Sequence, residues 1–178
     1  MVELIKQNFI ENKKIYQNVE TKLRKRIETN IPINHVGSTA IPNIEYGKNI
    51  IDILIGAVDN LQFEKIKQIL IEEGYVASQK SKDEIYQFFS STASETGSGD
   101  VHIHLVIIDT ERYKEFLILR DYLLSHDDEA KNYSDFKIKI LELGNRDRKE
   151  YKKAKSEYVT NLLNRSKDWY KNSMSKIH

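Results

Sequence analysis

A glycine-serine turn and a carboxylate inside an apolar run are the residues of this sequence best suited to chemistry. Gly37, Ser38 and Thr39 supply backbone N–H groups and hydroxyls at a turn, which suit phosphate oxygens. Asp52 lies in the apolar run NIIDILIGAV, where a carboxylate is costly to bury unless it is paired or binds a metal. Together they indicate phosphoryl or nucleotidyl transfer with a divalent cation. The alternative is an ordinary turn, with Asp52 paired to Lys48 or an arginine.

A second candidate group is the alternating series Asp100, His102 and His104. Side chains two residues apart share one face of a strand, so this carboxylate and the two imidazoles are expected to line up. Histidines act as metal ligands or general bases, and either role becomes favoured if they lie beside Asp52. The alternative is a half-exposed strand with its polar residues turned outward.

Basic side chains complete the candidate site. Arg120 falls near the inward stripe of a predicted helix, where a guanidinium either neutralises a buried carboxylate or clamps a phosphate. Lys48, just before the Asp52 strand, is placed to offset phosphate charge. A further set could add cationic and stacking groups to a ligand cleft, although the alternative that we favour is a solvated helix surface with aromatic packing: Tyr133, Lys137, Tyr151 and Lys155.

The elements that must position these residues follow from the spacing of apolar side chains. The pattern predicts an N-terminal helix, a small sheet with one crossover helix, and a helical C-terminal half, hence an α/β (α+β) fold. A mobile hairpin loop is expected where the sequence reads STASETGSGD. The expected helices are 3–29, 61–73, one after Thr110, one from Asp127 or Asp128 to about 143, and 148–170; the expected strands are 33–37, 49–58, 75–78, 85–90 and 101–108.

Length and composition indicate one folded domain at 1–170, made of the N-terminal helix (1–30), the sheet core (31–110) and the helical half (111–170), with a frayed tail at 171–178. The 178 residues include no cysteine, which excludes a disulfide framework, a thiol nucleophile and a thiolate metal site. We find neither a membrane-spanning apolar run nor a signal-peptide core, and we expect a cytoplasmic protein.

The net charge of +1 hides an uneven distribution. Residues 31–143 carry eleven basic and nineteen acidic side chains, whereas residues 144–178 carry ten basic and four acidic ones. A basic C-terminal segment can bind polyanions such as nucleic acid. The alternative, which we favour, is that basic terminal helices pair with the acidic centre of the chain.

Four segments, in order, carry a resemblance to a known family: HVGSTAIP, KNIIDILIGAV, VHIHLVI and LRDYLLSHDDEAKNYSDFK. Over roughly residues 1–165 the chain resembles the GrpB-like (UPF0157) family, which belongs to the nucleotidyltransferase superfamily of the DNA polymerase β type. The resemblance implies a nucleotidyltransferase-like core, an NTP substrate and a divalent cation, Mg or Mn, with Zn as a further option. Asn43 and Asn49 depart from the family pattern, in the loop before the Asp52 strand.

The resemblance also implies roles for individual residues. In the superfamily a Gly-Ser turn binds the triphosphate, which here falls on Gly37 and Ser38. A pair of carboxylates two residues apart binds metal; Asp52 matches the first, but Leu54 stands where the second is expected. His102 and His104 occupy the later strand where a third acid is expected, so they would complete the metal site with Asp52, or His104 would act as base.

Three functions follow as hypotheses. The first is an enzyme that transfers a nucleotidyl group from NTP to an unknown acceptor, with Asp52 and His104 as catalytic residues. The second is a binding module of the same fold for a nucleotide or a CoA-related ligand, which Leu54 favours; similar domains are found joined to dephospho-CoA kinase. The third is association with nucleic acid through the basic C-terminal segment.

Overall fold

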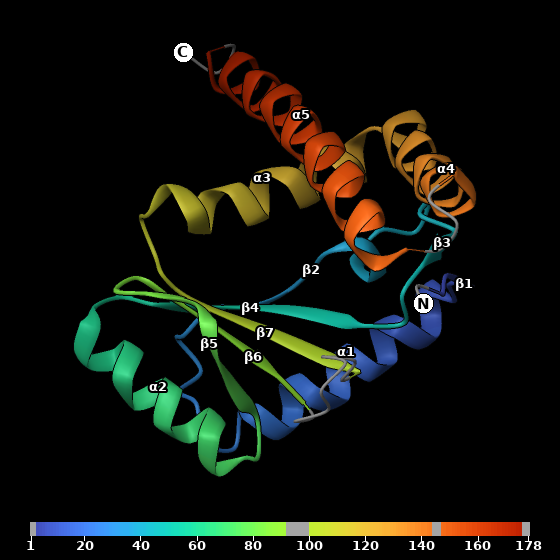
Figure 1. Cartoon of the computed structure of the whole chain (residues 1–178). Coiled ribbons are helices and arrows are strands. Elements are labelled where there is room, and N and C mark those ends of the chain that lie inside the picture. Colours follow the sequence, from blue (N-terminus) through green and yellow to red (C-terminus); the bar gives the residue numbers. More distant parts are fainter. Residues whose placement is uncertain (1–2, 92–99, 144–146, 176–178) are drawn as a thin grey trace.

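The structure of this chain is a computed structural model that describes residues 3–91, 100–143 and 147–175. Figure 1 shows a central sheet with helices on both sides. The elements, in chain order, are β1 (Ile5–Lys6), α1 (Phe9–Leu23), β2 (Ile33–Val36), a 3-10 turn (Ser38–Ala40), β3 (Tyr46–Gly47), β4 (Ile51–Ala57), α2 (Asn60–Glu72), β5 (Val76–Asp83), β6 (Tyr86–Ser90), β7 (Val101–Ile107), α3 (Glu111–Ser125), α4 (Asp127–Leu143) and α5 (Arg148–Met174).

The main sheet has five strands in the order β2-β4-β7-β6-β5. Strands β4 and β7 are parallel, and the other neighbouring pairs are antiparallel, so the sheet is mixed. The connection from β4 to β7 carries α2, β5 and β6. The predicted α/β (α+β) class, with a small mixed sheet and a helical C-terminal half, is therefore confirmed.

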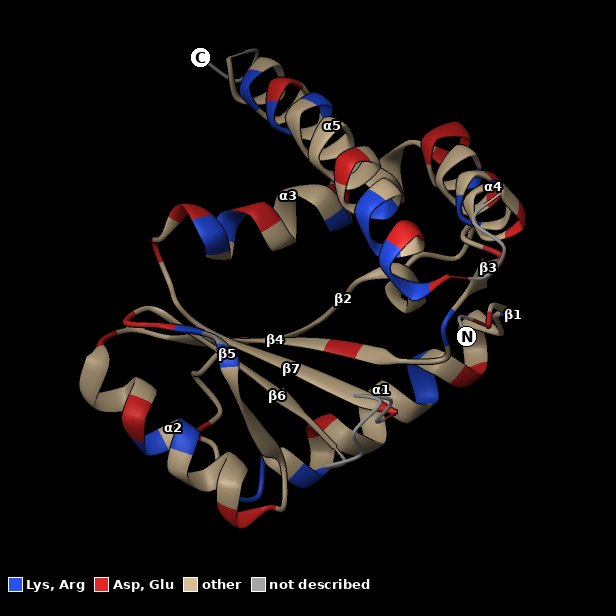
Figure 2. Cartoon of the chain, in the orientation of Figure 1, with Lys and Arg blue, Asp and Glu red and all other residues tan. Residues whose placement is uncertain are grey.

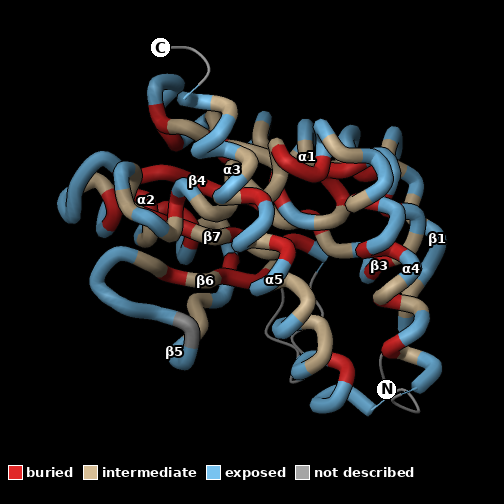
Figure 3. Tube along the Cα trace, turned by 90° about the horizontal axis from the view of Figure 1, so that it is seen from above, coloured by how far each residue is buried: buried red, intermediate tan, exposed pale blue. Residues whose placement is uncertain are grey.

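The alternation of side chains along β4 divides the sheet into two unlike faces. Ile51, Ile53 and Ile55 pack with α1 and α2 in the largest buried cluster. Asp52 and Leu54 lie on the opposite face, beneath the helical half, where Leu54 packs against Val36, Val106 and Tyr113. Figure 3 shows the buried stretches running along β4 and β6, with exposed helix surfaces around them. The site-bearing face of the sheet is thus the one toward α3, α4 and α5 (Figure 1).

Helix α1 is shorter than the predicted span of 3–29. The Asn8 side chain accepts a hydrogen bond from the Glu11 N–H and so caps the helix at Phe9. Residues before it pair instead with β3. At the other end, Arg24 donates to the carbonyls of Glu28 and Ile31, holding a bend after Leu23.

Other boundaries also differ from the sequence prediction. Strand β5 continues to Asp83, with an irregularity in its pairing between Ala77 and Lys82. Helix α5 continues to Met174, beyond the end expected at Tyr170. The predicted hairpin loop lies mostly outside the described residues.

Ion pairs link the basic terminal helices to acidic side chains of the central part of the chain. Figure 2 shows both signs of charge interspersed over the helices. The contacts include Lys22–Glu73, Arg26–Glu72, Arg165–Glu129 and Lys167–Glu115. This arrangement supports the paired-charge alternative, while nucleic-acid binding stays a prediction. No helix in the described part of the chain is long and apolar enough to cross a membrane.

Candidate functional site

Two adjoining cavities lie between the sheet and the helical half. The larger has a volume of about 540 Å³ and the smaller about 160 Å³. Both are lined by Ser38, Asp52 and Lys155, so these three residues form their common boundary. Six residues that the sequence singled out therefore converge on one region: Gly37, Ser38, Lys48, Asp52, His102 and His104.

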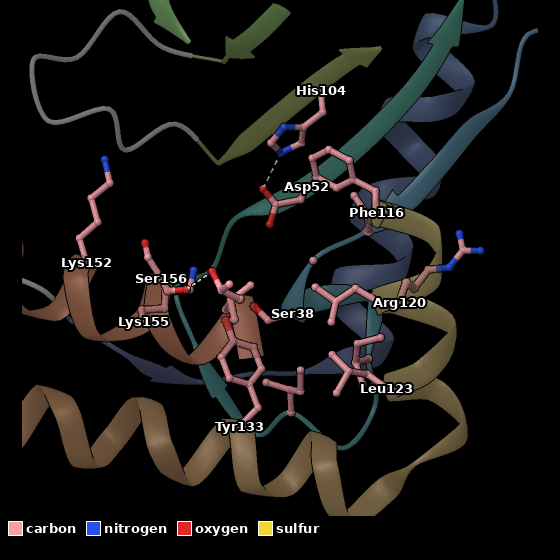
Figure 4. A pocket seen from close by; sticks show the side chains of 17 residues that line it. Ser38, Asp52, His104, Phe116, Arg120, Leu123, Tyr133, Lys152, Lys155 and Ser156 are labelled. Atoms are coloured by element: carbon pink, nitrogen blue, oxygen red, sulfur yellow. Dashed lines mark hydrogen bonds and ion pairs between the residues drawn. The ribbon is translucent and has the colours of Figure 1, made fainter. Parts of the chain in front are cut away.

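The larger cavity has a polar wall and an apolar wall. Figure 4 shows Asp52 and His104 on the strands facing Lys152, Lys155 and Ser156 of α5, with Tyr133 of α4 nearby. The apolar wall comes from the segment after the Ser38 turn and from α3 and α5: Ile41, Ile44, Phe116, Leu119, Leu123 and Val159. A cavity of this kind suits a ligand with a charged end and an apolar or aromatic body.

Gly37 brings the turn against Asp52. Its φ of 72° lies in the region that favours glycine, and a Cβ atom at this position would overlap Asp52 Oδ2. Ser38 begins the 3-10 turn that ends at Ala40, and it lines both cavities. Thr39, predicted as a phosphate ligand, instead donates its hydroxyl to the Ile50 carbonyl and lines neither cavity.

Asp52 is held by two imidazoles from the neighbouring strand. In the parallel register Asp52 lies opposite His102, and Leu54 lies opposite His104. Asp52 Oδ1 is 3.4 Å from His102 Nδ1 and 3.6 Å from His104 Nε2. Burial raises the pKa of Asp52, but the interactions with His102 and His104 outweigh it and hold that pKa below its usual value.

This arrangement does not fit the two-cation site of the superfamily. Leu54, in place of a second carboxylate, is fully buried among apolar side chains. Asp100, which precedes the histidines, is exposed and lines neither cavity. Across the described residues, no three His, Asp or Glu side chains are placed to hold a metal together. Mg²⁺ prefers several oxygen ligands, and Asp52 is the one carboxylate among the described lining residues.

Arg120 lines the larger cavity with its stem, but its guanidinium points away from the cavity (Figure 4). Its Nε donates to Asp121 Oδ1 at 2.7 Å, and Nη1 donates to Asn34 Oδ1 at 3.3 Å. In this structure Arg120 therefore ties α3 to β2, a placement that differs from the predicted phosphate clamp.

Lys48 and Lys137 both line the smaller cavity, as part of the predicted set of basic residues. Lys137 has 2% of its surface exposed, and its Nζ lies 4.9 Å from the centre of the Tyr133 ring. Burial, with a smaller contribution from Lys155, lowers the pKa of Lys137 to about 7. Burial and the nearby charges of Lys155, Arg148 and Lys152 lower the pKa of Lys48.

The α5 contribution to the larger cavity was largely missed by sequence reasoning. Lys152, Ser156 and Thr160 line it together with Lys155, which the sequence analysis named only as a possible additional cationic group. Their spacing of three, four and eight residues places them on one helix face, next to the apolar stripe that was used to predict the helix. The sequence signal that could have identified these lining residues was a row of polar side chains next to the row of apolar side chains on the same helix.

Comparison with known proteins identifies the family. The family model described as GrpB protein matches residues 6–165. This chain belongs to the GrpB family. A UPF0157 protein of Pseudomonas aeruginosa is 30% identical over 75% of this chain and 54% of its own length, so the chain spans about half of that relative. The glutamate-rich protein GrpB of Alkalihalophilus pseudofirmus is 31% identical over 74% of this chain and 76% of its own.

Solved structures show which fold the chain has. GrpB from Enterococcus faecalis superimposes with a TM-score of 0.79 at 16% identity, covering 94% of this GrpB family chain and 99% of that protein. The Cid1 poly(U) polymerase in its MgATP-bound form gives a TM-score of 0.51 at 12% identity, over 75% of this chain and 42% of the polymerase. The fold is therefore that of the nucleotidyltransferases.

Proposed function

We propose that this GrpB family protein binds a nucleotide or a related phosphorylated small molecule in the larger cavity. The phosphate groups lie at the Gly37–Ser38 turn and face Lys155 and Lys152. The observation that carries the proposal is this turn, pressed against Asp52 and facing two lysines across the same cavity. Backbone N–H groups and lysines are the usual protein partners of phosphate oxygens.

The rest of the cavity supports a ligand with a flat, apolar body. Phe116 and Tyr133 give aromatic surface, and Ile44 and Leu123 give aliphatic surface. Nucleobases pack well against such side chains. The fold neighbour Cid1 is described in MgATP-bound and MgGTP-bound forms, which favours a nucleotide as the first ligand class to test. A CoA-related ligand has the same combination of phosphates and an extended organic body.

Lys155 gives the sharpest test of ligand binding because it lines both cavities. We expect Lys155→Met to weaken nucleotide binding roughly tenfold to a hundredfold, since a hydrogen bond to a charged group contributes about 1.5–3 kcal/mol. Isothermal titration calorimetry with ATP, GTP, CTP, UTP, CoA and dephospho-CoA measures this effect. Lys153→Met is the matched control, because Lys153 is exposed on the same helix and lines neither cavity. Equal binding by the two variants would contradict the proposed site.

Nucleotidyl transfer is the second candidate, favoured by the position of Asp52 beside the Ser38 turn. In such a reaction an acceptor oxygen forms a bond to the α-phosphorus of NTP, and pyrophosphate leaves. Because the residues around Asp52 do not fit a two-cation site, we assign no catalytic step to a metal. Binding of one cation at Asp52, with His102 and His104, stays a prediction.

Asp52→Asn tests transfer separately from binding. If transfer occurs, this variant is expected to lower the rate of pyrophosphate release at least a hundredfold, because the amide neither carries charge nor accepts a proton. Pyrophosphate release is measured with each NTP in the presence of Mg²⁺, Mn²⁺ or Zn²⁺, with a range of hydroxyl acceptors. Asp135→Asn, at an exposed position on α4 and outside both cavities, is the control. A wild-type rate that survives in Asp52→Asn would remove Asp52 from the catalytic machinery.

A further inference from the structure

The smaller cavity concentrates positive charge. Lys48, Lys137 and Lys155 all line it, and Asp52 is the single carboxylate among its described lining residues. Asp52 is already engaged by His102 and His104, at 3.4 and 3.6 Å. Within the described residues none of the three lysines forms an ion pair, in contrast to Arg165 and Lys167 farther along α5. The cavity thus holds more cationic groups than its own residues neutralise.

Of the three lysines, Lys137 gives the strongest indication of a ligand. Its Nζ is buried and has no hydrogen-bond partner among the described residues. A buried amine without a partner is unfavourable, and a protein keeps such a group mostly where a ligand or a reaction uses it. The Tyr133 ring at 4.9 Å offers a cation–π contact but leaves the three N–H donors of an ammonium unused.

The size of the cavity limits what can satisfy these donors. Its volume of about 160 Å³ corresponds to roughly five water molecules, which is enough for one or two phosphoryl groups. It adjoins the larger cavity at Ser38 and Asp52, so an anion placed here would continue the phosphate chain of a ligand bound there. Tyr151, whose ring lies 5.9 Å from Lys48 Nζ, closes one side.

We propose that the smaller cavity is a subsite for terminal phosphates that works without a divalent cation, with Lys137, Lys48 and Lys155 neutralising the phosphate charge. This rests on the proposed function, because the subsite extends the cavity assigned to the ligand. A cation bridging the phosphates needs several oxygen ligands from the protein or water, whereas this cavity presents ammonium groups that repel it. The lysines therefore take the place that metal ions have in two-cation sites.

The test uses inorganic pyrophosphate as the probe and the full chain. In buffer with EDTA, isothermal titration calorimetry is expected to show pyrophosphate binding that weakens as salt increases. Lys137→Met is expected to weaken that binding at least tenfold. Lys139→Met, an exposed lysine on the same helix, is expected to bind like the wild type. Circular dichroism and thermal unfolding establish that both variants are folded.

The outcomes separate this inference from the proposed function. Nucleotide binding without pyrophosphate binding would overturn the subsite and leave the larger cavity intact as the ligand site. Pyrophosphate binding only when Mg²⁺ or Mn²⁺ is added would also overturn it, as would unchanged binding by folded Lys137→Met. Binding of neither probe would contradict both proposals.

Discussion

Lys137→Met is expected to raise the free energy of unfolding at pH 7 by an amount on the order of a few kcal/mol. The wild-type fold keeps an amine in a buried position without a hydrogen-bond partner among the described residues, and methionine has a similar length without the amine. Removing a desolvated, unpartnered polar group while keeping the volume filled is stabilising. Urea unfolding, followed by circular dichroism, measures the difference.

The pH dependence of this difference identifies its cause. In the unfolded chain the Lys137 amine stays protonated up to its ordinary pKa of 10.5, but in the folded chain it loses its proton at about pH 7. Between these values the unfolded state binds more protons, so wild-type stability gains from this group as the pH rises. The advantage of Lys137→Met should therefore be largest near or below pH 7 and should shrink toward pH 10.

Two controls protect this interpretation. Partly buried tyrosines such as Tyr86, whose pKa burial raises to about 12, also make stability depend on pH, but they are common to both proteins and cancel in the comparison. Lys139→Met should change stability by no more than about 0.5 kcal/mol, as is usual for exposed sites. An advantage of Lys137→Met that stays constant from pH 6 to 10 would mean that Lys137 is not a desolvated amine.

Gly37→Ala is expected to have the largest effect on ligand binding. The added Cβ overlaps Asp52 Oδ2, and alanine is strained at a φ of 72°. The turn and Asp52 must move apart, which displaces the N–H groups proposed to bind phosphate. We expect a loss of about 2–4 kcal/mol in unfolding free energy and at least a hundredfold loss in nucleotide affinity, because steric overlap adds to strain.

Gly74→Ala separates the effect of backbone strain from the effect of steric overlap. Gly74 also has a positive φ, of 90°, but a Cβ atom added there would meet no atom within 4 Å, so this variant carries the strain without the overlap. It should lose about 1 kcal/mol in stability and keep its affinity for nucleotide. The double variant Gly37→Ala/Asp52→Ala should recover part of the stability lost by Gly37→Ala, since it removes the overlapping carboxylate. Because Asp52→Ala keeps the Cβ atom, which would lie 2.9 Å from the added one, strictly additive losses would show that the overlap with the carboxylate does not determine the effect.

The sequence was most informative where the signal was local. The apolar run around Asp52 and the alternation around His104 were enough to predict two strands, and their parallel pairing then brings the side chains together. The start of the N-terminal helix depended on pairing between Lys6 and Tyr46, which lie forty residues apart, so the helical pattern alone began the element too early. Pairing between such distant segments does not produce a regular spacing of apolar residues in either segment, so it cannot be predicted from that spacing.

Side-chain direction was the second limit. The stripe of α3 correctly indicated that Arg120 lies near the inner face, but Asn34, on a distant strand, draws its guanidinium out of the cavity. For Lys137 the pattern favoured a solvated surface, because the burial of that part of α4 depends on how α4 packs against β3 and α5. The cationic site therefore became visible only after the packing of elements far apart in the sequence was known.

The two ends of helix α5 contact different parts of the molecule. Over its 27 residues, roughly 40 Å, the first half lines the cavities while the second half is fastened to α3 through Lys167. A ligand held between Ser38 and Lys155 therefore joins the sheet layer to the helical layer across the cavity that both residues line. The binding free energy of the ligand therefore stabilises the contact between the two layers. We expect the ligand-bound protein to unfold more cooperatively than the ligand-free protein, with fewer local openings between the layers.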